Sequence, residues 1–220
     1  FILSRAPHGG AFFERLKAAF PSTPIVFDTV DLHHLRMERQ VSFEGSEELI
    51  QAGRDMKELE LKVIRKADAT LLVSDFEVKY LHDEIGPFPS LVIPLIYESY
   101  ERSNGFKERK DIAFVGGYRH TPNVDAVEYL LEVIWPIYRK KNTGARLHIV
   151  GSNMPEAFHD YADEDVIVTG FVEDLEAYLE GIRLTVAPLR YGAGVKGKVG
   201  NSLRMGVPVV ATSLAAEGMG

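Results

Sequence analysis

The sequence predicts an α/β protein of two units, each built on a parallel sheet. Short apolar runs alternate along the chain with longer stretches of helical periodicity, and the polar stretch 98–110 interrupts this alternation before it restarts. Strands that alternate with helices form parallel sheets with right-handed crossovers, because each helix carries the chain back to the start of the next strand. We therefore expect a first domain over 1–97, a linker over 98–110 and a second domain over 111–220.

In the first domain the apolar runs are short enough for strands, and the helical stretches have recognisable ends. Ser46 and Ser74 stand where a helix N-cap is expected, and Pro21 follows an amphipathic stretch. The segment 28–34, which contains His33, is expected to be a loop that leaves the carboxyl end of a strand. The predicted strands are 1–4, 25–27, 69–73 and 91–95, and the predicted helices are 10–20, 46–66 and 75–84.

The helical stretches of the second domain also have recognisable ends. Thr121 is predicted to cap a helix that has Pro122 at its first position, and Pro136 is predicted to kink or restart that helix. Gly206, followed by Pro208, is predicted to end the last helix. The predicted strands are 112–115, 147–150, 166–169, 184–188 and 207–211, and the predicted helices are the one that begins at 122, then 175–179 and 195–205.

The composition is that of a globular chain. Hydrophobic residues make up 45% of the 220 positions, and no run of about 18 apolar residues is present that would span a membrane. The chain has no cysteine, which excludes disulfides and thiolate chemistry and is compatible with a reducing compartment. We expect a cytoplasmic protein. Since the chain starts at Phe1 and stops at Gly220, just after a strand, we also expect a fragment whose missing segments could attach it peripherally to a membrane.

A basic island interrupts an otherwise acidic chain. There are 25 Lys and Arg residues against 32 Asp and Glu, yet the stretch 181–216 contains no acidic residue. Such an island indicates a specific anionic ligand, whereas nucleic acid usually needs a broad basic face. The alternative is that these are ordinary solvated side chains. The cations of the island are Arg183, Arg190, Lys196, Lys198 and Arg204.

A glycine-rich loop lies inside this island. Gly192 and Gly194 allow a tight turn just before a helix, whose free N–H groups and dipole favour phosphate at its N-terminus. The glycines also fit the bare spacing of a dinucleotide-binding loop, but the lysines among them and their position late in the chain weaken that interpretation. Ligands of open α/β sheets bind beyond the carboxyl ends of the strands. We therefore expect the site at loops 116–120, 151–155 and 189–195.

Several segments of the second domain form a set: 114–117 (FVGG), 122–126 (PNVDA), 148–151 (HIVG), 168–175 (VTGFVEDL), 187–198 (APLRYGAGVKGK) and 206–212 (GVPVVAT). In this order they resemble the C-terminal, donor-binding domain of group 1 glycosyltransferases of the retaining, family 4-like type. The match covers roughly 111–218. The stretch 27–33 (FDTVDLH) resembles, more loosely, the end of the N-terminal, acceptor-side domain of some members.

This resemblance implies the GT-B architecture: two Rossmann-like units with parallel sheets, here truncated at both ends. It implies transfer of a sugar, with retention, from a nucleotide-diphosphate-sugar donor to a glycan, lipid or protein acceptor. No cofactor, obligatory metal or nucleic acid partner is implied. Two alternatives remain: a non-catalytic nucleotide-sugar-binding module, and another GT-B enzyme such as a nucleotide-sugar epimerase or a phosphorylase. Consumption of the donor distinguishes an enzyme from a module.

The resemblance also assigns site residues. Lys196 and Lys198 are expected to stabilise the charge on the leaving diphosphate, with Lys198 preferred. His33 is expected to contact the sugar or the acceptor. We do not expect it to bind a metal, because neighbouring histidines in a strand point to opposite faces. The expected donor-binding residues are Gly116, Gly117, Arg119, Gly170, Phe171, Val172, Gly194, Val195, Asn201 and Ser202.

The sequence departs from the family pattern at one motif. Group 1 enzymes often carry a Glu-x7-Glu pair, whose first member contacts the sugar and whose second contacts the ribose. Aligned through 206–210, these positions are Ala193 and Asn201. Asn201 can still hydrogen-bond a ribose hydroxyl, whereas Ala193 brings no carboxylate. Donor binding is therefore expected, and the non-catalytic module stands beside catalysis.

Overall fold

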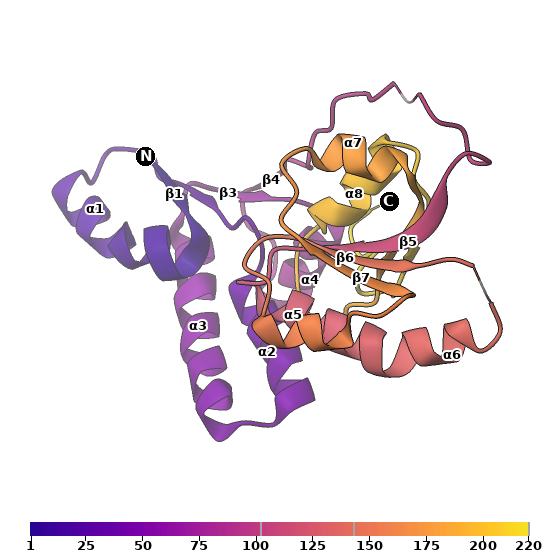
Figure 1. Cartoon of the computed structure of the whole chain (residues 1–220). Coiled ribbons are helices and arrows are strands. Elements are labelled where there is room, and N and C mark those ends of the chain that lie inside the picture. The colour runs from indigo at the N-terminus through magenta and orange to yellow at the C-terminus, as the bar shows by residue number, and fades with distance from the viewer. Residues whose placement is uncertain (102, 143, 220) are drawn as a thin grey trace. The chain divides into compact units, whose positions relative to one another are not determined.

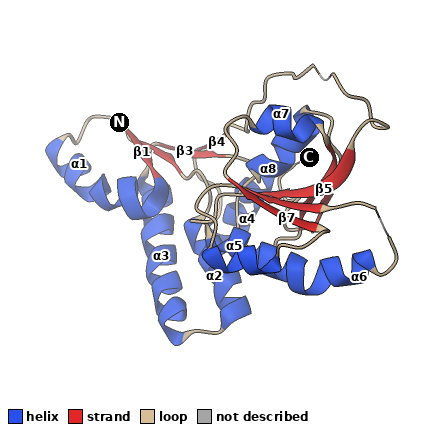
Figure 2. Ribbon diagram, in the orientation of Figure 1, coloured by secondary structure: helices blue, strands red, loops and turns tan. Residues whose placement is uncertain are grey.

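The computed structural model describes residues 1–101, 103–142 and 144–219 and divides into two compact units (Figure 1). Each unit is a parallel sheet with helices, so the predicted fold class is confirmed (Figure 2). Arg102, which falls in the predicted linker, lies outside the described residues. The first unit comprises Phe1–Leu95, Tyr191–Val195 and Glu217–Gly220, and the second comprises Ile96–Arg190 and Lys196–Ala216. The sequence had placed the two short segments of the first unit in the second domain.

The sheet of the first unit has its strands in chain order. Phe27, in the second strand, pairs with Leu3 on one side and Thr70 on the other. The last strand is shorter than predicted, because Ile93 makes the final ladder bond, to the carbonyl of Leu72 at 2.8 Å, and the proline after it has no N–H to donate. The strands are β1 (Ile2–Ser4), β2 (Val26–Asp28), β3 (Ala69–Leu72) and β4 (Ser90–Val92).

The helices of the first unit include one that sequence reasoning missed. His33 begins α2, so the prediction that 28–34 is a loop throughout is wrong. Helices α2 and α3 lie side by side (Figure 1) and are joined at Gly45, whose φ of 69° is the left-handed conformation that ends α2. The helical segments are Arg5–Gly9 (a π-turn, also not predicted), Gly10–Phe12 (3₁₀), α1 (Phe13–Ala19), α2 (His33–Glu44), α3 (Glu47–Lys66) and α4 (Asp75–Ile85).

The predicted caps have mixed outcomes. Ser74 caps α4 and accepts a hydrogen bond from the N–H of Glu77 at 3.4 Å. Ser46 is the N-cap residue of α3, but its side chain makes no capping hydrogen bond. Thr121 is the first residue of its helix, and His120 holds the cap position before it. The first two positions were therefore predicted correctly and the third was one residue too late.

The sheet of the second unit changes its winding direction at its centre. Its order is β7-β6-β5-β8-β9, so the chain first moves outward from β5 on one side and then returns to pair β8 with the other side of β5. The carboxyl ends of β5 and β8 are consequently a topological switch point, where open α/β sheets bind their ligands. The strands are β5 (Lys110–Val115), β6 (Leu147–Val150), β7 (Val166–Gly170), β8 (Ile182–Ala187) and β9 (Val209–Ala211).

The helices of this unit cover both faces of its sheet. Figure 1 shows α5 and α6 on one face and α7 and α8 on the other. Pro136 lies in the first turn of α6, after a π-helical segment, so the predicted restart of the helix is confirmed. Helix α8 begins later than predicted, because Lys196 has an extended conformation. The segments are α5 (Thr121–Tyr129), a π-segment (Leu130–Ile134), α6 (Trp135–Arg139), a 3₁₀ segment (Glu156–Tyr161), α7 (Leu175–Glu180) and α8 (Gly197–Arg204).

Candidate functional site

The switch point of the second unit brings together the residues that the sequence singled out for phosphate. Gly116 and Gly117 directly follow β5. Lys196 is the N-cap residue of α8, the helix that follows β8, and Lys198 lies in its first turn. The N–H of Val199 donates to the carbonyl of Lys196 at 2.9 Å. The N–H groups of Gly197 and Lys198 precede the first intrahelical hydrogen bond, so they can bind an anion together with the lysines. Glycine backbone, helix N-terminus and two lysines thus meet at one corner of the unit.

Asn123 joins the two sides of this corner. It lies in the first turn of α5, and its side chain is buried, with 6% of the residue exposed. Its Nδ2 donates to the carbonyl of Gly117 at 2.8 Å, and its Oδ1 accepts a hydrogen bond from Nζ of Lys198. Sequence reasoning quoted Asn123 only as part of a motif. The signal available was a polar residue in the first turn of a helix that follows a glycine loop.

Lys198 is a lysine with which no carboxylate of the described residues forms an ion pair. Burial, together with the charge of Lys196, lowers its pKa to about 7. Its ammonium lies 4.4 Å from the centre of the Phe114 ring, a favourable cation–π contact. Within the described ranges no acidic side chain forms an ion pair with it. The corner is therefore poor in negative charge, which an anionic ligand would supply.

The glycines after β5 allow the backbone of this loop to pass close to the side chains of Phe114 and Asn123. A Cβ on Gly116 would lie 2.9 Å from Cε1 of Phe114 and 3.0 Å from Cγ of Asn123, so a side chain there would displace Asn123. The N–H of Gly116 already donates to the carbonyl of Val150 at 3.0 Å. The N–H of Gly116 is thus already used within the unit, and the donor-binding role of both glycines stays a prediction. Gly117 donates to no acceptor in the part of the chain that the structure describes.

The remaining predicted donor residues before α8 lie at or beyond the carboxyl ends of β5 and β7, and they differ in exposure. Arg119 is exposed, and its Nε donates to Oδ1 of Asn153 at 3.0 Å. Gly170 ends β7 with a φ of 75°, and the next residue, Phe171, is 72% exposed. Val172 is half-buried. An exposed aromatic ring beyond the carboxyl end of a strand is free to stack on a ligand, and its role stays a prediction.

The two predicted residues on α8 already have partners within the unit. Asn201 accepts a hydrogen bond from Nε of Arg204 at 3.2 Å. Ser202 is 2% exposed, donates to the carbonyl of Lys198 at 2.9 Å and accepts from Oγ1 of Thr185 at 2.9 Å. The hydroxyl of Ser202 therefore holds α8 against the sheet. Only the side-chain oxygen of Asn201 takes part in this hydrogen bond, and its contact with a donor stays a prediction.

His33, Gly194 and Val195 belong to the first unit. Gly194 has a φ of 71°, and a Cβ there would lie 2.9 Å from Cβ of Asp31, so this position requires glycine. Nδ1 of His33 lies 3.3 Å from the carbonyl oxygen and 3.4 Å from Oδ1 of Asp31. Gly194 and His33 thus both lie close to Asp31.

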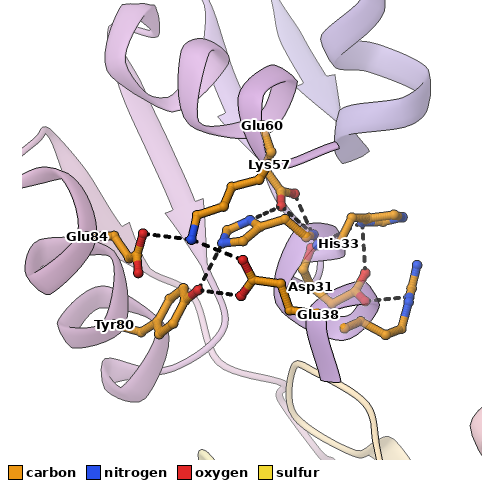
Figure 3. A network of polar contacts seen from close by, with 9 residues as sticks. Asp31, His33, Glu38, Lys57, Glu60, Tyr80 and Glu84 are labelled. Carbon is orange, nitrogen blue, oxygen red and sulfur yellow. Dashed lines mark hydrogen bonds and ion pairs between the residues drawn. The ribbon is translucent and has the colours of Figure 1, made fainter. Parts of the chain in front are cut away.

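Figure 3 shows the polar network in which His33 is held. The N–H of His33 donates to Oε1 of Glu60 at 3.2 Å. Further along, the hydroxyl of Tyr80 donates to Oε2 of Glu38 at 3.2 Å, and Lys57 lies between Glu38 and Glu84 at 3.0 and 2.8 Å. Side chains of α3 and α4 thus bind α2 at His33 and at Glu38.

The described residues contain no group of three or more His, Cys, Asp or Glu side chains placed to hold a metal ion. Asp28 accepts hydrogen bonds from the N–H of Val30 and from the hydroxyl of Ser4, each at 3.2 Å. Among the helices described, none is both long and apolar enough to cross a membrane.

The model of the family called glycosyl transferases group 1 matches residues 109–219. The chain belongs to this family. The match contains the sheet of the second unit and the whole corner around Lys198. A curated relative of this group 1 chain is an uncharacterized 44.6 kDa protein in the cps region of Klebsiella pneumoniae, 26% identical over 136 residues, or 58% of the chain. The chain spans 34% of the length of that relative.

Solved structures resemble the group 1 chain across both units. TarM has a TM-score of 0.73 at 13% identity, over 97% of this chain and 40% of its own. Sucrose-phosphate synthase from Thermosynechococcus elongatus has a TM-score of 0.70 at 17% identity, over 98% and 56%. Anabaena HepE in complex with UDP and glucose has a TM-score of 0.64 at 12% identity, over 98% and 60%. At such identities the likeness concerns the fold, which is GT-B as predicted.

Proposed function

We propose that this protein transfers a sugar from a nucleotide-diphosphate-sugar donor to a glycan acceptor, with retention of configuration. The observation that carries the proposal is the corner at the switch point, where Asn123 accepts a hydrogen bond from Lys198 beside the N-terminus of α8 and no acidic side chain of the described residues pairs with Lys198. Membership of the group 1 family supports the reaction class. The complex of Anabaena HepE with UDP and glucose makes UDP the first nucleotide to test.

The chemistry of the corner suits the departure of a diphosphate. Cleavage of the donor's glycosidic bond adds negative charge to the leaving diphosphate, and cations already in place lower the energy of that transition state. Lys198, Lys196 and the first N–H groups of α8 supply this charge without a metal ion. His33 is assigned to the sugar or acceptor side, where its link to Asp31 at 3.3 Å orients the ring. We further propose a cytoplasmic location.

One observation favours a second candidate, a module that binds a nucleotide sugar without turnover. Ala193 stands where group 1 enzymes often have a sugar-contacting glutamate. The methyl group of alanine can neither accept a hydrogen bond from a sugar hydroxyl nor stabilise a positive charge on the sugar. The two candidates differ in one readout: an enzyme consumes the donor in the presence of acceptor, or slowly with water, whereas a module returns it unchanged.

The test is a calorimetric titration of the whole chain with UDP, GDP, ADP and the corresponding nucleosides. We expect one diphosphate to bind, its nucleoside to bind more weakly, and Lys198→Met to weaken the diphosphate by about 1.5–3 kcal/mol, the scale of a charge-assisted hydrogen bond. Lys141→Met, at an exposed lysine at the end of α6, is the matched control. Failure of every diphosphate to bind, or equal losses in both variants, would contradict the proposal.

A further inference from the structure

The side chain of Asn123 makes hydrogen bonds to two different segments of the second unit. Its amide donates to the carbonyl of Gly117, in the turn after β5, and accepts from the ammonium of Lys198, in the helix after β8. We propose that Asn123 is a positioning residue of the donor site, which holds Lys198 and the Gly117 turn together so that the two loops bind one diphosphate. This inference rests on the proposed function, since it concerns the same site.

Asn123 can position Lys198 and still leave N–H donors of its ammonium for a ligand. An ammonium has three N–H donors, and within the described residues Asn123 is the hydrogen-bond acceptor of Lys198. Two donors therefore remain for phosphate oxygens. The same amide also fixes the carbonyl of Gly117. Loss of Asn123 would free a long lysine side chain and the turn at the same time.

An amide is also the right acceptor electrostatically. Lys196 faces Lys198 from the preceding loop, β5 contributes the ring of Phe114, and the nearby carboxylate of α5, Asp125, is bound by Arg190 at 2.5 and 3.0 Å. Asn123 adds no charge to this set. Lys198 is consequently only partly protonated near neutral pH, and an arriving diphosphate completes its charge by raising its pKa. A carboxylate at 123 would raise the pKa of Lys198, so that the lysine would already be protonated before the diphosphate arrives, and it would compete with the phosphate for the ammonium.

The experiment measures pyrophosphate and UDP binding by calorimetry from about pH 6.5 to about pH 8.5, in two buffers of different ionisation enthalpy, which counts the protons taken up. The variants are Asn123→Ala and Asn123→Asp, which has nearly the same shape and so preserves the fold. The control is Asn142→Asp, an identical change at an exposed asparagine whose Nδ2 donates to the carbonyl of Tyr138. The unfolding midpoint of each variant is measured beside binding.

We expect Asn123→Ala to lose at least about tenfold in affinity, as for a hydrogen bond to a charged group. Asn123→Asp is expected to bind more weakly and to abolish proton uptake, while Asn142→Asp behaves as the wild type. A purely structural role would leave proton uptake unchanged. If Asn123→Ala binds as tightly as the control, or if Asn123→Asp takes up as many protons as the wild type, this inference fails and the proposed function stands. If the wild type itself binds no diphosphate, both fail.

Discussion

The carboxylate of Glu60 caps a helix to which it does not belong, through its contacts with His34. Oε2 of Glu60 accepts from the N–H of His34 at 3.0 Å and lies 2.6 Å from Nδ1 of the same residue. Both side chains are 0% exposed. Because the residue before α2 is Leu32, which offers no side-chain acceptor, the first turn of α2 depends on a residue of α3 for its N–H groups.

We expect Glu60→Ala to destabilise the first unit by roughly 3 kcal/mol, because it leaves the N–H groups of His33 and His34 buried without an acceptor. Urea denaturation measures the free energy of unfolding. Glu58→Ala, at an exposed glutamate of the same helix, is the control and is expected to change stability little. Similar losses in both variants would show that Glu60 does not act as the cap.

Gly200 is predicted to be indispensable inside α8, because a Cβ there would overlap the ring of Tyr97. Gly200→Ala should cost about 2 kcal/mol of unfolding free energy through overpacking. The control is Gly53→Ala within α3, where the nearest atom would be Cβ of Met37 at 3.8 Å, and a gain of about 0.5–1 kcal/mol is expected. In a double-mutant cycle Tyr97→Ala should remove most of the penalty, and additive effects would contradict the overlap.

Diphosphate affinity is predicted to fall as the pH rises above neutrality. Burial lowers the pKa of Lys198 from 10.5 to about 7, so the free protein loses this positive charge as the pH rises through that value. Each further pH unit should weaken binding, by at most about tenfold, until the pKa of the bound state is passed. Lys198→Arg, which stays charged, should flatten the profile. Parallel profiles of the two proteins would exclude Lys198 as the titrating group.

Glu77 is expected to make the first unit less stable as the pH rises from acid to neutral. Burial, together with the nearby charges of Asp31 and Glu60, raises the pKa of Glu77 from 4.5 to about 7. The folded state thus binds more protons than the unfolded state between these values. The stabilising contribution is complete below pH 4.5 and is lost as the pH rises through about 7.

Glu77→Gln tests this sign. The neutral amide should remove that pH dependence, so the variant should gain on the wild type between about pH 5 and about pH 8 in urea denaturation. In this variant the amide N–H groups can also replace Oε1 of Glu77, an oxygen that has no hydrogen-bond partner among the described atoms. Glu58→Gln is the control. A constant difference between wild type and Glu77→Gln at all pH values would mean that Glu77 keeps its charge in the fold.

Local patterns predicted most of the elements, and they failed where the deciding partner lies far away in the sequence. The residues 33–44 form a helix whose end at Gly45 was a readable signal, but whose start has no capping side chain of its own, because Glu60 supplies it. Helix α8 begins only at Gly197, after an extended Lys196 and the turn in which Gly194 lies against Asp31. Periodicity and capping rules carry no information about such contacts.

The sequence by itself determined the alternation of strands and helices, the parallel sheets, the family and the residue types of the phosphate corner. These follow from apolar periodicity, from glycine and proline, and from a run without acids, all of which are properties of neighbouring residues. Only the tertiary structure decided that Asn123 would hold Lys198, and that Ser202 would spend its hydroxyl on Thr185 and the backbone. The physical reason is that a hydrogen bond between distant residues depends on strand order, which places β8 beside β5.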